Sequence, residues 1–77
     1  MNYVSVDWAC AGSETARRLG FAHGCYTVKV HAGYCGMGRA ISGHRFARDA
    51  DIAAHALGLP FDAAGQLVRH AKGGEVQ

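Results

Sequence analysis

Three cysteines and five histidines are the side chains with the widest range of possible chemistry in this 77-residue sequence. His23 and Cys25 are two residues apart, so on a strand both side chains would point the same way. Zinc binds such thiolates and imidazoles in tetrahedral geometry. However, the sequence contains no Cys-x-x-Cys or His-x-x-x-His pair, the close spacing expected of zinc ligands. We therefore predict that the protein holds no metal and no other cofactor.

The same residue types could also place a nucleophilic thiol beside a histidine. Cys10, Cys25 and Cys35 carry no local signature of a cysteine enzyme, and an odd number of cysteines is a poor disulfide framework. Reduced thiols that pack as small hydrophobic residues are the simpler expectation. We predict that the protein is not an enzyme; a small metal- or thiol-dependent enzyme is the catalytic alternative.

Basic side chains gather between residues 39 and 48, although the formal net charge is only +2. Arginine binds phosphate or carboxylate groups through two parallel hydrogen bonds. Such a stretch therefore predicts a binding surface for nucleic acid or for acidic protein, whereas the alternative is a strand edge that is charged to prevent aggregation. The predicted partner-binding residues are Lys29, Tyr34, Arg39, His44, Arg45 and Arg48.

Alternating apolar residues predict strands over residues 3–8 and 25–31, with a glycine-containing strand over 34–41 that returns antiparallel. Ser13 and Gly20 have the residue types that begin and end a short helix. Asp49 is the expected cap of a helix over residues 50–58, in which Ile52 belongs to the apolar face. A second C-terminal helix is expected from Pro60 to Lys72.

This order predicts one α+β domain over residues 1–77, built from a three-stranded antiparallel sheet, a short helix and two C-terminal helices packed on one face. A content of 49% hydrophobic and 18% charged residues is typical of a globular chain. No apolar run approaches the ~20 residues that cross a membrane. We expect a cytoplasmic protein, in the host cytoplasm if a phage encodes it, with no membrane or small-molecule partner.

Residues 49–72 resemble a helix-turn-helix, the DNA-binding motif in which a small residue precedes the turn glycine by four positions, here Ala54 and Gly58. The resemblance implies a small DNA-binding regulator. The second helix would read bases with its first residues, which are Phe61, Asp62 and Ala63. An aspartate at that place repels phosphate, so we keep this function as an alternative.

As a short α+β chain with a charged face and no paired catalytic groups, the sequence resembles in kind the small anti-CRISPR inhibitors that phages and mobile elements direct against type I effectors. The resemblance includes no shared motif and transfers no residue. It implies a non-enzymatic protein that binds a multisubunit nucleoprotein effector and blocks its DNA binding. The expected partner is therefore a protein or nucleoprotein complex, with nucleic acid contact as a further possibility.

Overall fold

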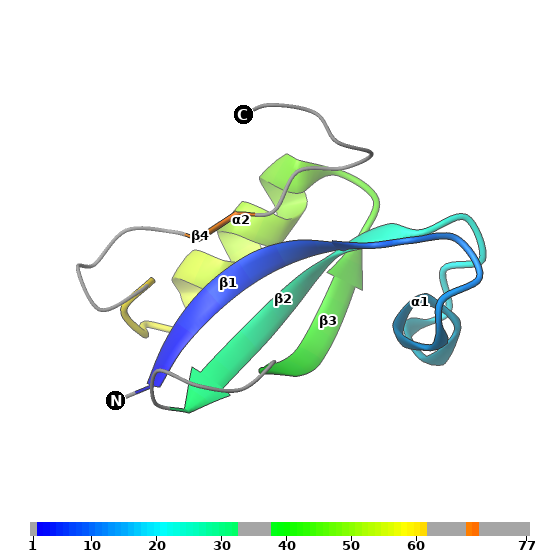
Figure 1. Ribbon diagram of the computed structural model, residues 1–77. Coiled ribbons are helices and arrows are strands. Elements are labelled where there is room, and N and C mark those ends of the chain that lie inside the picture. The colour runs from blue at the N-terminus through cyan, green and yellow to red at the C-terminus, as the bar shows by residue number, and fades with distance from the viewer. Residues whose placement is uncertain (1, 33–37, 62–67, 70–77) are drawn as a thin grey trace.

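The computed structural model describes residues 2–32, 38–61 and 68–69 (Figure 1). Strand β1 (Asn2–Ala9) pairs antiparallel with β2 (Cys25–Ala32), which in turn pairs antiparallel with β3 (Arg39–His44). A two-residue strand, β4 (Val68–Arg69), runs parallel to β1 and completes a sheet in the order β3-β2-β1-β4. The predicted α+β fold with a three-stranded antiparallel sheet is confirmed.

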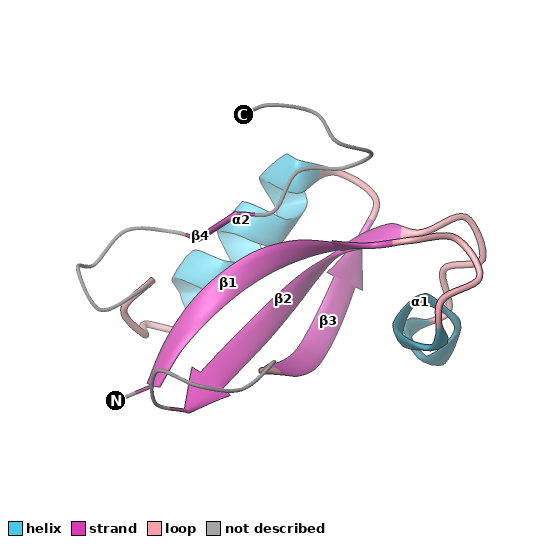
Figure 2. Ribbon diagram, in the orientation of Figure 1, coloured by secondary structure: helices cyan, strands magenta, loops and turns pink. Residues whose placement is uncertain are grey.

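The core lies between one face of the sheet and helix α2 (Ala47–Ala56), as Figure 2 shows. Val4, Val6 and Val28 are fully buried, and α2 contributes Ala50 and Ala54 to the same cluster. Small side chains on α2 let the helix lie close to the valines. The alternation that predicted β1 and β2 is therefore confirmed by the valines that face α2.

Helix α1 (Glu14–Leu19) lies at the end of the sheet where β1 and β2 are connected (Figure 1). The Ser13 side chain accepts a hydrogen bond from the backbone N–H of Ala16, and Gly20 has a φ of 89°. The N–H of Gly20 bonds the Arg17 carbonyl, and the N–H of Phe21 bonds the Ala16 carbonyl. Both predicted ends of this helix are confirmed.

The bounds of β3 and α2 differ most from the expectation, and α2 ends at Ala56 instead of residue 58. Strand β3 spans residues 39–44 instead of 34–41, and residues 33–37 lie outside the described residues. Helix α2 begins at Ala47, three residues before the expected start, so Asp49 lies inside its first turn. The N-cap residue is Phe46, whose side chain makes no capping hydrogen bond. Packing of Ala50 and Ala54 on the sheet fixes this start in place of a side-chain cap.

The second C-terminal helix, expected from Pro60 to Lys72, is not confirmed. Val68 and Arg69 form β4 beside Ser5 and Val6 of β1. The backbone N–H of Val4 donates to the Pro60 carbonyl at 2.9 Å, which ties the chain after α2 to the β1 edge. Hydrogen bonding with the edge of β1 therefore outweighs the helical spacing of apolar residues in this segment. The β-branched side chain of Val68 also favours a strand. The other predicted helical residues, 62–67 and 70–72, lie outside the described residues.

The structure thus contains two helices among the described residues, α1 and α2. Neither is long and apolar enough to span a membrane.

Candidate functional site

The length of β3 divides the predicted basic surface into two parts. Arg39 begins the strand and Arg45 follows its last residue. Six steps at ~3.3 Å per residue place the two arginines roughly 20 Å apart. Arg39 therefore lies at one end of the sheet, whereas His44, Arg45 and Arg48 lie at the other. Tyr34 lies outside the described residues.

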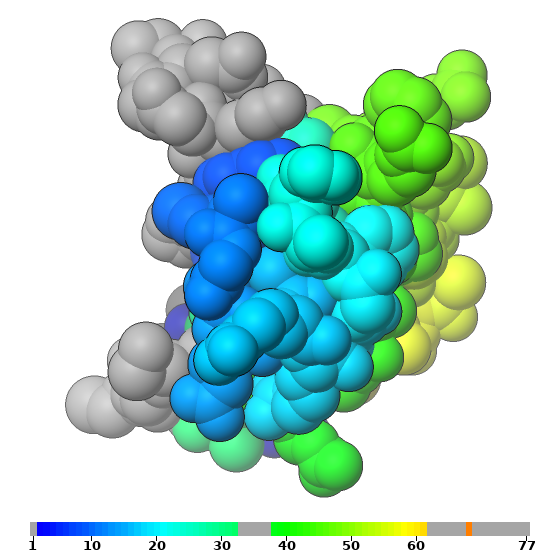
Figure 3. Space-filling view, turned by 90° about the vertical axis from the view of Figure 1, so that its right-hand side faces the viewer, coloured from blue at the N-terminus to red at the C-terminus, as the bar shows by residue number. Residues whose placement is uncertain are grey.

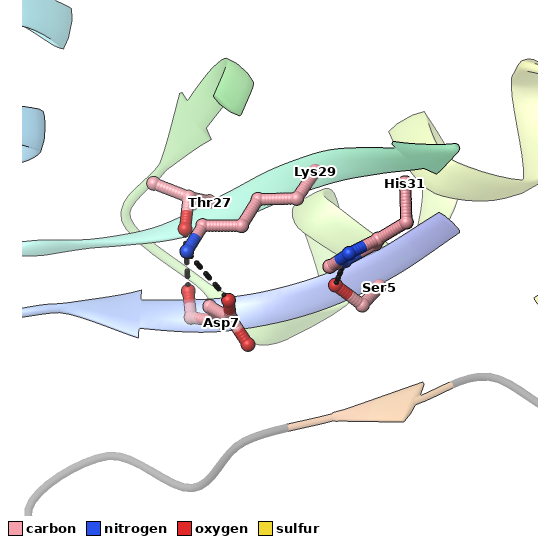
Figure 4. Close-up of polar contacts among 5 residues, drawn as sticks. All are labelled: Ser5, Asp7, Thr27, Lys29 and His31. Carbon is pink, nitrogen blue, oxygen red and sulfur yellow. Dashed lines mark hydrogen bonds and ion pairs between the residues drawn. The ribbon is translucent and has the colours of Figure 1, made fainter. Parts of the chain in front are cut away.

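Lys29 is engaged within the sheet (Figure 4). Its Nζ lies 2.8 Å from Oδ2 of Asp7, and both side chains are mostly buried. The Thr27 hydroxyl donates to the Asp7 carbonyl at 2.9 Å, which fixes the neighbouring backbone. A cation that is already paired and shielded contributes little to partner binding, so we leave Lys29 out of the binding surface described below.

His44 also has a partner inside the fold, because its Nε2 lies 2.9 Å from the Ser42 hydroxyl. Arg45 and Arg48 are exposed. Arg48 Nε lies 4.0 Å from Oδ1 of Asp49. Such an exposed pair is weak, so it leaves the guanidinium able to bind another group. Two of the predicted cations, Arg45 and Arg48, are thus suited to bind a partner.

Two large apolar side chains lie exposed in the same segment, and sequence reasoning missed both. Phe46 and Ile52 are each 61% exposed. The helical period placed Ile52 in the core, but Ala50 and Ala54 occupy that face of α2. Ile52 instead lies four residues after Arg48 and therefore on the same side of the helix. We call Arg45, Phe46, Arg48 and Ile52 the junction surface: Arg45 and Phe46 lie where β3 passes into α2, and Arg48 and Ile52 follow on one side of α2.

A pocket of about 390 Å³ lies next to the junction surface. Figure 3 shows the side of the molecule on which the α1–β2 connection lies beside the β3–α2 connection. Gly43 allows this approach, because a Cβ there would lie 3.0 Å from the Phe21 ring and from Cys25 Sγ. The pocket is lined by Gly20, Phe21, Ala22, His23, Gly24 and Arg45.

The Cys25 thiol is buried in the sheet. Burial raises the pKa of the Cys25 thiol above its ordinary value of 9.0, and a backbone hydrogen bond with His44 opposes this shift only in part. The thiol is therefore protonated at neutral pH and a poor nucleophile. Cys10 is exposed, and Cys35 lies outside the described residues. Within residues 2–32, 38–61 and 68–69, no three potential metal ligands gather.

A buried serine–histidine pair lies on the sheet face opposite α2 (Figure 4). Ser5 Oγ and His31 Nε2 are 2.6 Å apart, and the two residues are 1% and 9% exposed. The imidazole stacks on the Tyr3 ring, with centroids 4.5 Å apart. Its other side faces Gly38, where a Cβ would lie 2.6 Å from the ring. The enclosure of Ser5 leaves no room for a substrate, so we interpret the pair as structural.

Ser5→Ala tests this interpretation. The change leaves a buried imidazole nitrogen without its hydrogen-bond partner, which should cost about 1–3 kcal/mol of unfolding free energy. Urea unfolding should show this loss, and Ser5→Ala combined with His31→Phe should recover part of it. Ser42→Ala is the matched control, because Ser42 bonds a histidine that is only half buried. Equal losses at the two serines would contradict the assignment.

The described residues thus offer exposed arginine and apolar side chains in the junction surface, a pocket lined by Arg45, and buried polar pairs that hold the sheet. The chain matches no family model, no curated protein and no solved structure.

Proposed function

We propose that this chain is a non-enzymatic binding protein that docks onto a larger protein partner through the junction surface. The observation that carries the proposal is Phe46, which is 61% exposed at the N-cap of α2. Serine, threonine or aspartate at this position would bond a free N–H and stabilise the helix by about 1 kcal/mol. A position that forgoes local stability to expose an aromatic ring is typical of a functional surface.

The other residues of the junction surface support a protein partner. Aromatic and arginine side chains are enriched in protein interfaces and among the residues that dominate binding energy. Arg45 and Arg48 favour an acidic patch on the partner, and Ile52 favours apolar contact. A nucleic acid would use the arginines and could stack a base on Phe46, but it would leave Ile52 without a matching contact, because Ile52 offers neither charge for phosphate nor a ring for bases.

We propose further that the partner belongs to a multisubunit nucleoprotein effector of the type I CRISPR class, and that binding blocks the effector's DNA binding. Small size, an α+β fold and a charged face support this assignment, as they do in the sequence. The helix-turn-helix alternative has less support, since Val68 and Arg69 of its second helix form β4.

The first test is affinity capture from cells that carry type I effectors, with and without nuclease. Recovery of the effector in both samples supports the inhibitor proposal, and the purified complex should then lose DNA binding when the chain is added. Recovery of DNA alone would favour the regulator. Failure to bind any member of a panel of type I effectors would overturn the assignment of the partner.

The second test is Arg45→Ala with Arg48→Ala, which should weaken partner binding at least tenfold. Each charge-assisted hydrogen bond contributes ~1.5–3 kcal/mol, and ~1.4 kcal/mol corresponds to a factor of ten. Arg17→Ala with Arg18→Ala removes the same charge from α1 and should weaken binding much less. Calorimetric titrations of all three proteins measure the difference. Equal losses would indicate a general effect of charge and refute the junction surface.

A further inference from the structure

The pocket beside the junction surface has a rigid frame. Gly24 has a φ of 91°, and a Cβ there would lie 2.7 Å from Trp8 Cζ2 and 2.8 Å from the Ala9 carbonyl oxygen. Gly43 allows Phe21 to lie against β3 in the same way, at the limit of contact. The α1–β2 connection is therefore packed onto both β1 and β3, so the position of the pocket relative to Arg45 is fixed by the fold.

Arg45 supplies positive charge to the walls of this pocket. Among the described residues, no carboxylate lines it. Phe21 and Ala22 supply apolar wall, which lowers the local dielectric and strengthens a charge contact made there. A pocket of this composition fits an anion with a short apolar stem.

The hydrogen-bond donors of the pocket bear on which anion it binds. Phosphate sites commonly use several free backbone N–H groups. In this pocket, the N–H groups of Gly20, Phe21 and Gly24 already bond the carbonyls of Arg17, Ala16 and Phe21. Among the described residues, the N–H groups of Ala22 and His23 have no backbone hydrogen bond, so they remain as donors beside the Arg45 guanidinium. The fork of that guanidinium matches the two oxygens of a carboxylate.

We infer that this pocket binds a carboxylate, and that in the complex the carboxylate belongs to a glutamate or aspartate side chain of the protein partner. The second half rests on the proposed function, because it takes the partner to be a protein. Carboxylate binding by the free chain does not depend on it. The acidic anchor would lie beside Phe46, so one partner segment could place an acid in the pocket and an apolar residue on the junction surface.

The test is an NMR titration of the ¹⁵N-labelled chain with N-acetylglutamate methylamide at constant ionic strength. Saturable shifts should occur at Gly20–Gly24 and at the Arg45 side chain. N-acetylglutamine methylamide, a neutral probe of the same shape, should produce none at these positions. Inorganic phosphate forms a third arm. Equal response to the neutral probe, tighter binding of phosphate, or no saturable shift would overturn the inference.

Arg45→Gln should weaken binding of the glutamate probe roughly fivefold to tenfold, since one exposed charge-assisted contact is lost. Arg39→Gln removes the same charge from the far end of β3 and should leave the affinity within twofold. If Arg39→Gln has the same effect as Arg45→Gln, the shifts report net charge and not a site. Two results together would refute this inference and leave the proposed function standing. Phe46 variants would lose partner binding, and the unmodified chain would show no shifts on addition of the glutamate probe.

Discussion

Phe46→Ser should weaken partner binding about thirtyfold while it changes the stability of the free protein by less than about 1 kcal/mol. A residue that dominates an interface costs ~2 kcal/mol or more when truncated, and that loss corresponds to about thirtyfold. Two effects on folding oppose each other. Serine caps α2 and contributes about 1 kcal/mol, whereas the buried part of the Phe46 ring is lost at a similar cost.

Ile41→Ser is the matched control, because Ile41 is another exposed apolar residue but lies within β3, away from the junction surface. It should leave partner binding within about threefold. Titration against the captured partner and urea unfolding of both variants provide the two measurements. If Phe46→Ser binds the partner normally, the exposed ring has no role in docking. The proposal then depends on the arginines alone.

Local signals account for the parts of the fold that the sequence predicts well. Ser13 begins α1 because its hydroxyl accepts a hydrogen bond from a backbone N–H of the first turn. Gly20 ends α1 because glycine readily adopts a positive φ. Strands β1 and β2 follow from alternating valines. The start of α2 could not be found this way, because Phe46 is not a capping residue and Asp49, which is one, lies inside the first turn.

Contacts between distant residues account for what the sequence did not predict. Val68 joins β1 across more than sixty positions, and His31 bonds Ser5 across 26. In the polar half of the alternation in β1, Ser5 is enclosed by its pairing with His31 and Asp7 is held by Lys29. A periodic pattern identifies two faces of a strand; it does not show that both are covered.

The sequence predicted the residue types of the candidate site better than it predicted where those residues lie. Arg45 and Arg48 have the exposure that a binding surface needs, because the chain turns into α2 directly after β3. Arg39 belongs to the same stretch of sequence but is carried away by the extended strand between them. No sequence pattern indicates the pocket beside Arg45, because it depends on glycines that pack against residues far along the chain.

Gly24→Ala should destabilise the protein by about 3 kcal/mol. An alanine at a φ of 91° costs roughly 1–2 kcal/mol of backbone strain. The added Cβ would overlap the Trp8 ring at 2.7 Å and the Ala9 carbonyl oxygen at 2.8 Å, and the second of these is backbone that moves only if the end of β1 moves. Overpacking of this kind adds about 1–3 kcal/mol. A 77-residue domain has roughly 4–12 kcal/mol in total, so the loss is a large fraction of it.

Gly12→Ala separates the two causes. Gly12 has a φ of 79°, but no atom lies within 4 Å of a Cβ built there, so only the backbone strain applies. Urea unfolding should show a loss of about 1 kcal/mol at Gly12 and about 2 kcal/mol more at Gly24. The excess measures how firmly the α1–β2 connection is packed against β1, and the same packing fixes the pocket beside Arg45. If the two variants lose equal stability, that connection yields easily, and the pocket has no fixed frame from which to hold an acidic side chain.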